Sequence, residues 1–186
     1  MLEELSLFRC DSLVEIHPSI GQLSKLEFLY LPCCKSLTDL PCMSAVMQSL
    51  EYLVLTECPK ISSFPKFTGI MKGLWTLSLA GTAIKKVEPS SIECLPALII
   101  LDLGGTNVKS LPRLPSTIRS IRVEGCDFLK WLPTWVKLSI WSQSLSKWLP
   151  YDERCNQKEF TILFHFLQVI SSLPLSLSLS LSLLNC

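Results

Sequence analysis

The sequence predicts an α/β repeat solenoid with a parallel concave sheet on one side and irregular or 3-10 segments on its convex side. Three observations lead to this prediction. An apolar triplet recurs every 24 residues, a small polar or thiol residue follows each triplet at a fixed distance, and an apolar–proline step marks the second half of most repeats. One such repeat cannot bury its own apolar face, so copies must stack and share a core.

The triplet consists of an apolar residue, another three positions later and another five positions later. Its last two members are separated by one residue, which is the period of a β-strand. Spacing and composition are typical of leucine-rich repeats, with about six copies in residues 1–133. We expect one short parallel strand per copy, centred near the last two members of each triplet. The triplets at 24-residue intervals are Leu2/Leu5/Leu7, Leu26/Leu29/Leu31, Leu50/Leu53/Leu55, Leu74/Leu77/Leu79 and Leu98/Leu101/Leu103, and a sixth, shorter-spaced copy follows as Ile118/Ile121/Val123.

A small polar or thiol residue stands eight positions after each triplet begins. We expect it where the chain turns off the strand, with its side chain bonded to backbone groups of the neighbouring turn. The next apolar residue comes three positions after a cysteine but two after a threonine, which indicates two turn variants. Because Cys10, Cys34 and Cys58 share this position, we expect them to be stacked, buried and reduced. The six residues are Cys10, Cys34, Cys58, Thr82, Thr106 and Cys126.

The second half of the repeat predicts the irregular side of the solenoid. Proline follows an apolar residue at 40–41, 64–65, 111–112 and 132–133, and proline suits an irregular wall better than a regular helix. Two repeats carry a Ser-Ile-x-x-Leu run, at 19–23 and 91–95. Each run is long enough for one helical or 3-10 turn.

Composition argues against several classes of function. The net charge of +1 gives no electrostatic case for nucleic acid, although residues 1–60 hold eight acids and four bases, a net of −4. The nine cysteines form no Cys-x-x-Cys pair, the two histidines are isolated, and no Asn-x-Ser/Thr acceptor exists. These features favour a reducing setting without a metal site. No catalytic or phosphate-binding motif is found, so we expect neither an enzyme nor a cofactor.

Several segments resemble the leucine-rich repeat region of plant disease-resistance proteins of the nucleotide-binding, TIR-containing class. The resemblance covers roughly residues 1–133 and implies intracellular sensing of pathogen effectors, in the cytoplasm or nucleus. It also implies that the repeats restrain a nucleotide-binding domain. No phosphate loop or TIR domain is present, so we expect a fragment without nucleotide binding or NAD cleavage. The segments are 13–21, 34–37, 79–84 and 111–126.

Residues 134–186 form a tail outside the repeat pattern. Residues 160–186 contain no charged residue and end in a Ser-Leu alternation. A translated CT dinucleotide repeat produces such an alternation, and we favour a disordered apolar tail. The alternative, a membrane helix, is disfavoured by His165, Gln168 and the alternating serines.

Function is expected on the outward positions of the strands. Phe28, Tyr30, Tyr52 and Val54 should form one exposed patch on two adjacent strands. Phe8 and Trp75 should flank this patch, which is typical of a protein-binding hot spot. Glu3, Glu27 and Glu51 should stack as an acidic ladder, which we interpret as a solvated rim.

The predicted function is therefore protein binding, to an effector or to the nucleotide-binding domain of a longer parent protein. Two alternatives are kept. One is the ectodomain of a membrane-anchored leucine-rich repeat receptor, and the other is a substrate-adaptor repeat domain of the ubiquitin system. Both lack a supporting motif, because glycosylation acceptors and an F-box-like helix are missing from the sequence.

Overall fold

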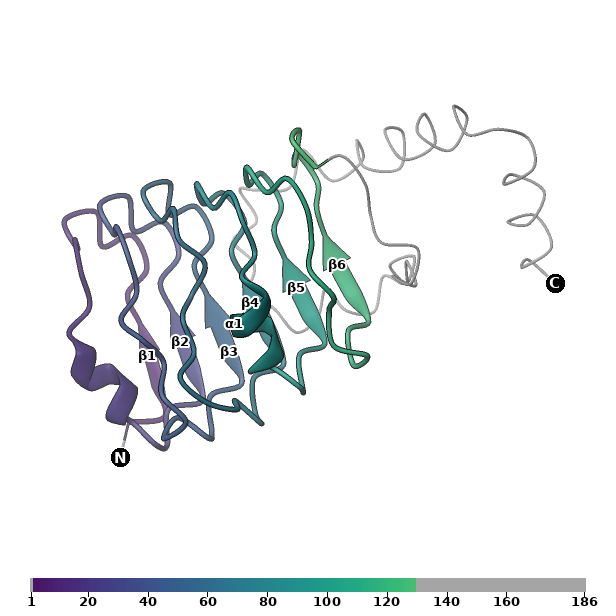
Figure 1. The fold of residues 1–186 in the computed structure, drawn as a ribbon. Helices are drawn as coiled ribbons and strands as arrows, with labels where there is room; N and C mark the ends of the chain where they lie inside the picture. The colour runs from purple at the N-terminus through teal and green to yellow at the C-terminus, as the bar shows by residue number, and fades with distance from the viewer. Residues whose placement is uncertain (1, 130–186) are drawn as a thin grey trace, which may run out of the picture. The chain divides into compact units, whose positions relative to one another are not determined.

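The computed structural model describes residues 2–129, which form a repeat solenoid with a parallel sheet along one wall (Figure 1). The six strands lie in chain order, β1 to β6, so each strand pairs with the strands of the turns before and after it. One strand per turn confirms the predicted number of copies. The strands are β1 (Glu4–Ser6), β2 (Phe28–Tyr30), β3 (Tyr52–Val54), β4 (Thr76–Ser78), β5 (Ile100–Asp102) and β6 (Ser120–Arg122).

The strand register repeats the spacing of the sequence. Leu5 pairs with Leu29, Leu29 with Leu53, and Leu53 with Leu77, so each step is one full repeat. All pairs are parallel, as predicted. Each strand is centred on the second member of its triplet and ends one residue before the third. The predicted centres are therefore about one residue too far along the chain.

The apolar triplets fill the space between the two walls. Leu29, Leu53 and Leu77 are fully buried, and so are the other two leucines of each of their triplets. Leu5 and Leu7 of the first turn are only half-buried, because no earlier turn covers them among the described residues. The core is thus built by contact between turns.

The wall opposite the sheet is irregular, with two short helical segments. The 3-10 helix η1 (Pro18–Gln22) and the helix α1 (Pro89–Glu93) form at the two Ser-Ile-x-x-Leu runs, as predicted. Both begin at a proline, whose fixed φ suits the first helical position. Between them an isolated parallel bridge joins Met43 to Phe67, and both side chains are buried.

Every turn leaves its strand through a residue with a left-handed backbone. This residue directly precedes the small polar or thiol position, and in the first five turns its N–H donates to the next turn, as in the 2.7 Å bond from Gly81 to the Gly104 carbonyl. Three turns use glycine, which has no Cβ to oppose a positive φ, and three use residues for which this conformation is costly. The six residues are Arg9, Cys33, Glu57, Gly81, Gly105 and Gly125.

Cysteine and threonine anchor the turn in two different ways. The Cys58 thiol donates to the Leu31 carbonyl of the preceding turn at 3.1 Å, and Cys34 and Cys126 make the equivalent bond. The Thr82 hydroxyl instead donates to the Leu79 carbonyl of its own turn, so the predicted contact with the neighbouring turn is wrong for threonine. Thr106 behaves as Thr82 does.

The backbone replaces the missing side-chain link in the threonine turns. The N–H of Ala83 donates to the Ile61 carbonyl of the previous turn at 2.8 Å, and Asn107 repeats this bond with Ile84. In the cysteine turns the chain instead closes on itself, as in the bond from the Ile61 N–H to the Cys58 carbonyl. The two turn variants predicted from spacing are therefore confirmed, and they differ in which group reaches the neighbour.

Burial of the cysteines follows the position of each turn. Cys34 and Cys58 are fully buried, and all seven described cysteines are free thiols. Cys10 is only half-buried, which corrects the prediction for this residue. It belongs to the first turn, which has no described turn before it. The proposed boundary at residue 133 and the tail at 134–186 lie outside the described residues.

The burial of a leucine should decide how much its replacement by alanine lowers the free energy of unfolding. We expect Leu53→Ala to lower the free energy of unfolding by about 2–5 kcal/mol, because Leu53 is fully buried between two turns. Leu5→Ala should cost less than half as much, since Leu5 already contacts solvent. Urea unfolding followed by circular dichroism measures both values. Equal losses would contradict a core built by stacking.

The left-handed residue provides a second test. A Cβ at Gly105 would meet only the Gly81 backbone, at 3.7 and 3.8 Å, so the cost of Gly105→Ala should be conformational. We expect a loss of about 1–2 kcal/mol. Glu57→Gly, at the same position two turns earlier, should change stability by less than about 1 kcal/mol, because relief of strain and the added entropy of the unfolded chain oppose each other. A neutral Gly105→Ala in the same unfolding assay would argue against the strained turn.

Candidate protein-binding face

The outward residues of the strands form two rows along the sheet, which we call the strand face. In a parallel sheet with this register, residues at the same repeat position lie side by side. The row on the amino side begins with Glu4, Phe28 and Tyr52, and the next row with Ser6, Tyr30 and Val54. The remaining members are Thr76, Ile100 and Ser120 in the first row and Ser78, Asp102 and Arg122 in the second.

Three aromatic side chains of the adjacent strands β2 and β3 stack on the strand face. Phe28 lies between the other two: its ring centroid is 5.0 Å from that of Tyr52 and 6.0 Å from that of Tyr30, with interplanar angles of 17° and 14°. All three are half-buried, whereas the adjacent leucines are fully buried. The predicted difference in exposure is therefore confirmed. We call Phe28, Tyr30 and Tyr52 the aromatic cluster.

The other predicted site residues are arranged differently from the expected patch. Val54 is only 9% exposed. Its inclusion in an exposed patch is therefore wrong. Phe8 and Trp75 are exposed, at 49% and 42%, but lie at opposite edges of the sheet. Phe8 follows the carboxyl end of β1, while Trp75 precedes the amino end of β4. Within residues 2–129, neither ring stacks with the aromatic cluster.

The electrostatic surroundings of the cluster keep Tyr30 protonated. Burial raises the pKa of the Tyr30 hydroxyl, and the nearby Tyr52 and Glu4 raise it further. The neutral hydroxyl remains a hydrogen-bond donor at physiological pH. The cluster therefore offers apolar ring surface together with a donor for a carbonyl or carboxylate of a ligand.

A second polar group at the other end of the strand face was not predicted. Arg122 lies 3.7 Å from a carboxylate oxygen of Asp102, and the Gly104 N–H donates to the other oxygen at 3.0 Å. The Ser78 hydroxyl, on the neighbouring strand β4, donates to the carboxylate at 3.5 Å. Burial raises the pKa of the Asp102 carboxyl, against the effect of these three partners. Opposite charges at one repeat position of adjacent copies are the signal that would have revealed this pair.

Two buried thiols, those of Cys34 and Cys58, have a structural role. Burial raises the pKa of the Cys58 thiol to about 11, and burial also raises that of Cys34. Both are held as donors to a carbonyl of the preceding turn, and a protonated thiol is a poor nucleophile. In the part of the chain that the structure describes, no group of acidic, histidine and cysteine side chains is placed to hold a metal ion.

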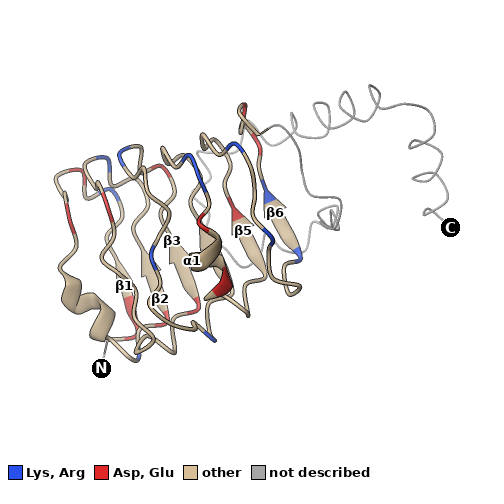
Figure 2. Cartoon of the chain, in the orientation of Figure 1, with Lys and Arg blue, Asp and Glu red and all other residues tan. Residues whose placement is uncertain are grey.

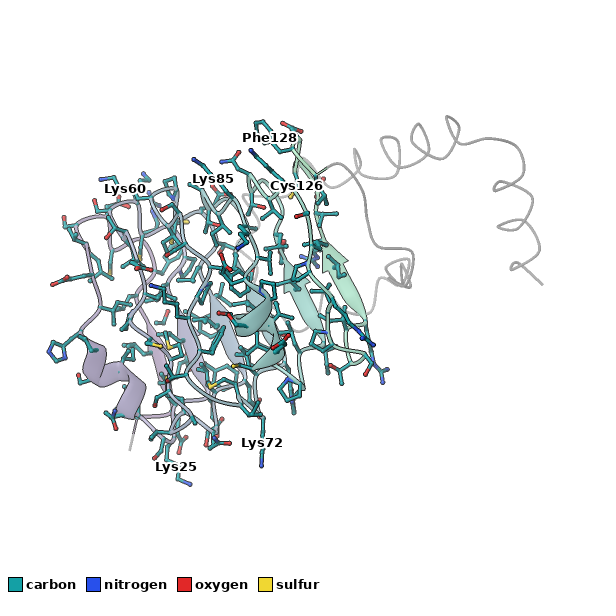
Figure 3. The ribbon with its side chains drawn as sticks, viewed as in Figure 1. Lys25, Lys60, Lys72, Lys85, Cys126 and Phe128 are labelled. Atoms are coloured by element: carbon teal, nitrogen blue, oxygen red, sulfur yellow. The ribbon has the colours of Figure 1, made fainter. Side chains whose placement is uncertain are left out.

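Lysines project from both edges of the solenoid and away from the strand face. Figure 3 shows Lys25 and Lys72 at the edge where the strands begin, and Lys60 and Lys85 at the edge of the turns.

No helix within residues 2–129 is both long and apolar enough to span a membrane. The strand face thus offers stacked rings, hydroxyls and carboxylates, which are groups suited to non-covalent binding.

Comparison with known proteins identifies no relative: no protein-family description, curated protein or solved structure matches this chain.

The exposed Cys42 thiol should react faster than the buried thiols of Cys34 and Cys58. At pH 8, Cys42 is exposed and should react readily with iodoacetamide. Cys58 should react more than about 100-fold more slowly than a thiol of ordinary pKa, because little of it is thiolate and its sulfur is buried. Peptide mass spectrometry identifies the modified sites, and unfolding in urea should abolish the difference. A Cys34–Cys58 disulfide, or equal rates at Cys42 and Cys58, would contradict this arrangement.

Proposed function

We propose that the chain is a protein-binding solenoid of the leucine-rich repeat class that contacts its partner through the strand face. The stacking of Phe28, Tyr30 and Tyr52 on adjacent strands carries this proposal. Partly exposed aromatic rings on a rigid sheet are typical of binding hot spots. Their apolar surface favours a covering partner, because contiguous exposed apolar area costs solubility.

The class of repeat is supported by two features. The apolar triplet recurs at the spacing of leucine-rich repeats, and each copy provides one parallel strand. Cysteine or threonine after each strand and the apolar–proline steps extend the resemblance to plant disease-resistance proteins. On this basis the role is sensing of an effector, or an inhibitory contact with a nucleotide-binding domain, in cytoplasmic or nuclear defence signalling.

The same reasoning makes the role a binding function without catalysis. The Cys34 and Cys58 thiols are protonated and serve as donors to carbonyls, and the polar groups of the strand face are hydroxyls, carboxylates and the Arg122 guanidinium on a sheet surface. Recognition by such a surface depends on shape and on a few aromatic contacts. We therefore propose a protein partner and neither a nucleic acid nor a cofactor.

Truncation of the tyrosines tests the proposed face. Tyr30→Ala and Tyr52→Ala should each weaken binding of the partner by about 1 kcal/mol or more, roughly fivefold. Their cost to folding should remain well below the ~2–5 kcal/mol of Leu53→Ala, because both tyrosines are half-buried on the outside of the sheet. Partner binding by calorimetry and urea unfolding of the same variants measure both effects.

A signalling assay distinguishes the two kinds of partner. With the solenoid joined to nucleotide-binding and TIR domains and expressed in leaf tissue, constitutive cell death in the tyrosine variants indicates a lost inhibitory contact. Loss of the effector response alone indicates a lost recognition surface. Phe128→Ala, which removes an exposed aromatic ring outside the two rows of the strand face, serves as the matched control. Unchanged binding and signalling in both tyrosine variants would refute the proposed face.

A further inference from the structure

Three glutamates form a ladder along the amino edge of the first three strands. Glu3, Glu27 and Glu51 occupy one repeat position, and their backbones are bonded in sequence, with the Glu27 N–H 2.7 Å from the Glu3 carbonyl and the Glu51 N–H 2.9 Å from the Glu27 carbonyl. Neighbouring members are therefore about one strand spacing apart, ~4.8 Å. Figure 2 shows the acidic colour at the lower ends of these strands. Like charges at this spacing repel each other.

No described cation neutralises this ladder. The three ion pairs found within residues 2–129 join Asp11 to Lys35, Glu88 to Lys86 and Asp102 to Arg122. Lys25 and Lys72 lie at the same edge of the solenoid, yet both project away from it and neither forms an ion pair there (Figure 3). The ladder carboxylates, together with the exposed Glu4 on β1, therefore present uncompensated negative charge.

The ladder and the aromatic cluster are parts of one surface. Phe28 and Tyr52 directly follow Glu27 and Glu51 in the chain, and the Phe28 N–H donates to the Glu3 carbonyl at 3.1 Å. Glu4 pairs with Phe28 in the sheet register. A cation bound over these rings would be attracted by the ring faces and by the carboxylates at the same time.

The charge at the repeat position of Glu3, Glu27 and Glu51 reverses along the sheet. After the three glutamates come Trp75 and Ile99, and the last copy carries the exposed Arg119. The negative charge of this position is thus confined to the first three strands, two of which, β2 and β3, carry the aromatic cluster. Such coincidence of charge and ring surface defines the chemistry of the partner at this end of the sheet.

On the basis of the proposed function, we propose that the partner segment bound by the aromatic cluster is cationic, a stretch of protein bearing Arg or Lys. Its cations stack on the outer ring faces of the cluster, those of Tyr30 and Tyr52, and pair with the ladder carboxylates. They also relieve the repulsion within the ladder. Segments rich in phosphate or carboxylate are repelled by the same charges. The surface therefore selects its partner by charge as well as by apolar contact.

Peptide binding to the full chain tests this proposal. The probe is a fluorescent Gly-Ser-Leu peptide with spaced Arg residues, compared with the same peptide carrying Gln in place of Arg. We expect the Arg peptide to bind at least about tenfold more tightly than the Gln peptide and to lose affinity as salt rises. Tyr30→Ala should also weaken it, because the cluster contributes ring surface.

Charge removal on and off the ladder provides the matched control. The double variant Glu27→Gln/Glu51→Gln should weaken the Arg peptide about tenfold and reduce its salt dependence. Glu15→Gln/Glu93→Gln removes the same charge from exposed positions away from the strand face and should have little effect. Circular dichroism and urea unfolding confirm that both double variants fold.

Three results would overturn the cationic partner: no binding of the Arg peptide, equal binding of the Gln peptide, or equal weakening by the two double variants. None of them bears on the protein-binding face itself, which is tested by the effect of Tyr30→Ala and Tyr52→Ala on a protein partner. If the tyrosine variants left partner binding unchanged while the Arg peptide still bound, the surface would bind cations but would not have the proposed protein-binding function.

Discussion

The backbone ladder between successive turns is the interaction on which the rest of the structure depends. Adjacent strands exchange N–H to carbonyl bonds in one register, and the ladder continues past the strand to the left-handed residue, where the Glu57 N–H reaches the Ala80 carbonyl at 2.7 Å. A slip by one residue would turn every buried leucine outward. The 24-residue spacing is therefore fixed by the core and by the ladder together, and neither is stable without the other.

The variation between turns is absorbed where the ladder ends. A cysteine thiol reaches back to the previous turn, whereas a threonine hydroxyl closes on its own turn and leaves the link to a backbone N–H. Either solution satisfies the groups at the bend, and for the described residues no buried side-chain donor or acceptor lacks a partner. Turns of different composition can consequently stack without disturbing the strands.

The sequence predicted most of the fold because periodicity reports burial directly. The register, the two turn variants and both short helices follow from residue spacing. The site was predicted less well, because spacing gives a position on the sheet and not a side-chain conformation. Val54 is buried although its position faces outward, and Trp75 does not stack with the cluster. The Asp102–Arg122 pair was missed although both residues stand at one repeat position, because that position was assessed for apolar side chains and not for opposite charges.

The same register that buries the leucines explains why the proposed recognition falls on the strand face. Alternate residues of each strand are excluded from the core, so their identity is free to change at little cost to folding. In this chain those positions carry aromatic rings on β2 and β3 and a charge pair on β5 and β6. Because the turns hold adjacent rows at a fixed spacing, rings such as Phe28 and Tyr52 are already stacked before a partner arrives. Little ordering is then needed on binding, and that preorganisation is what a rigid solenoid contributes to affinity.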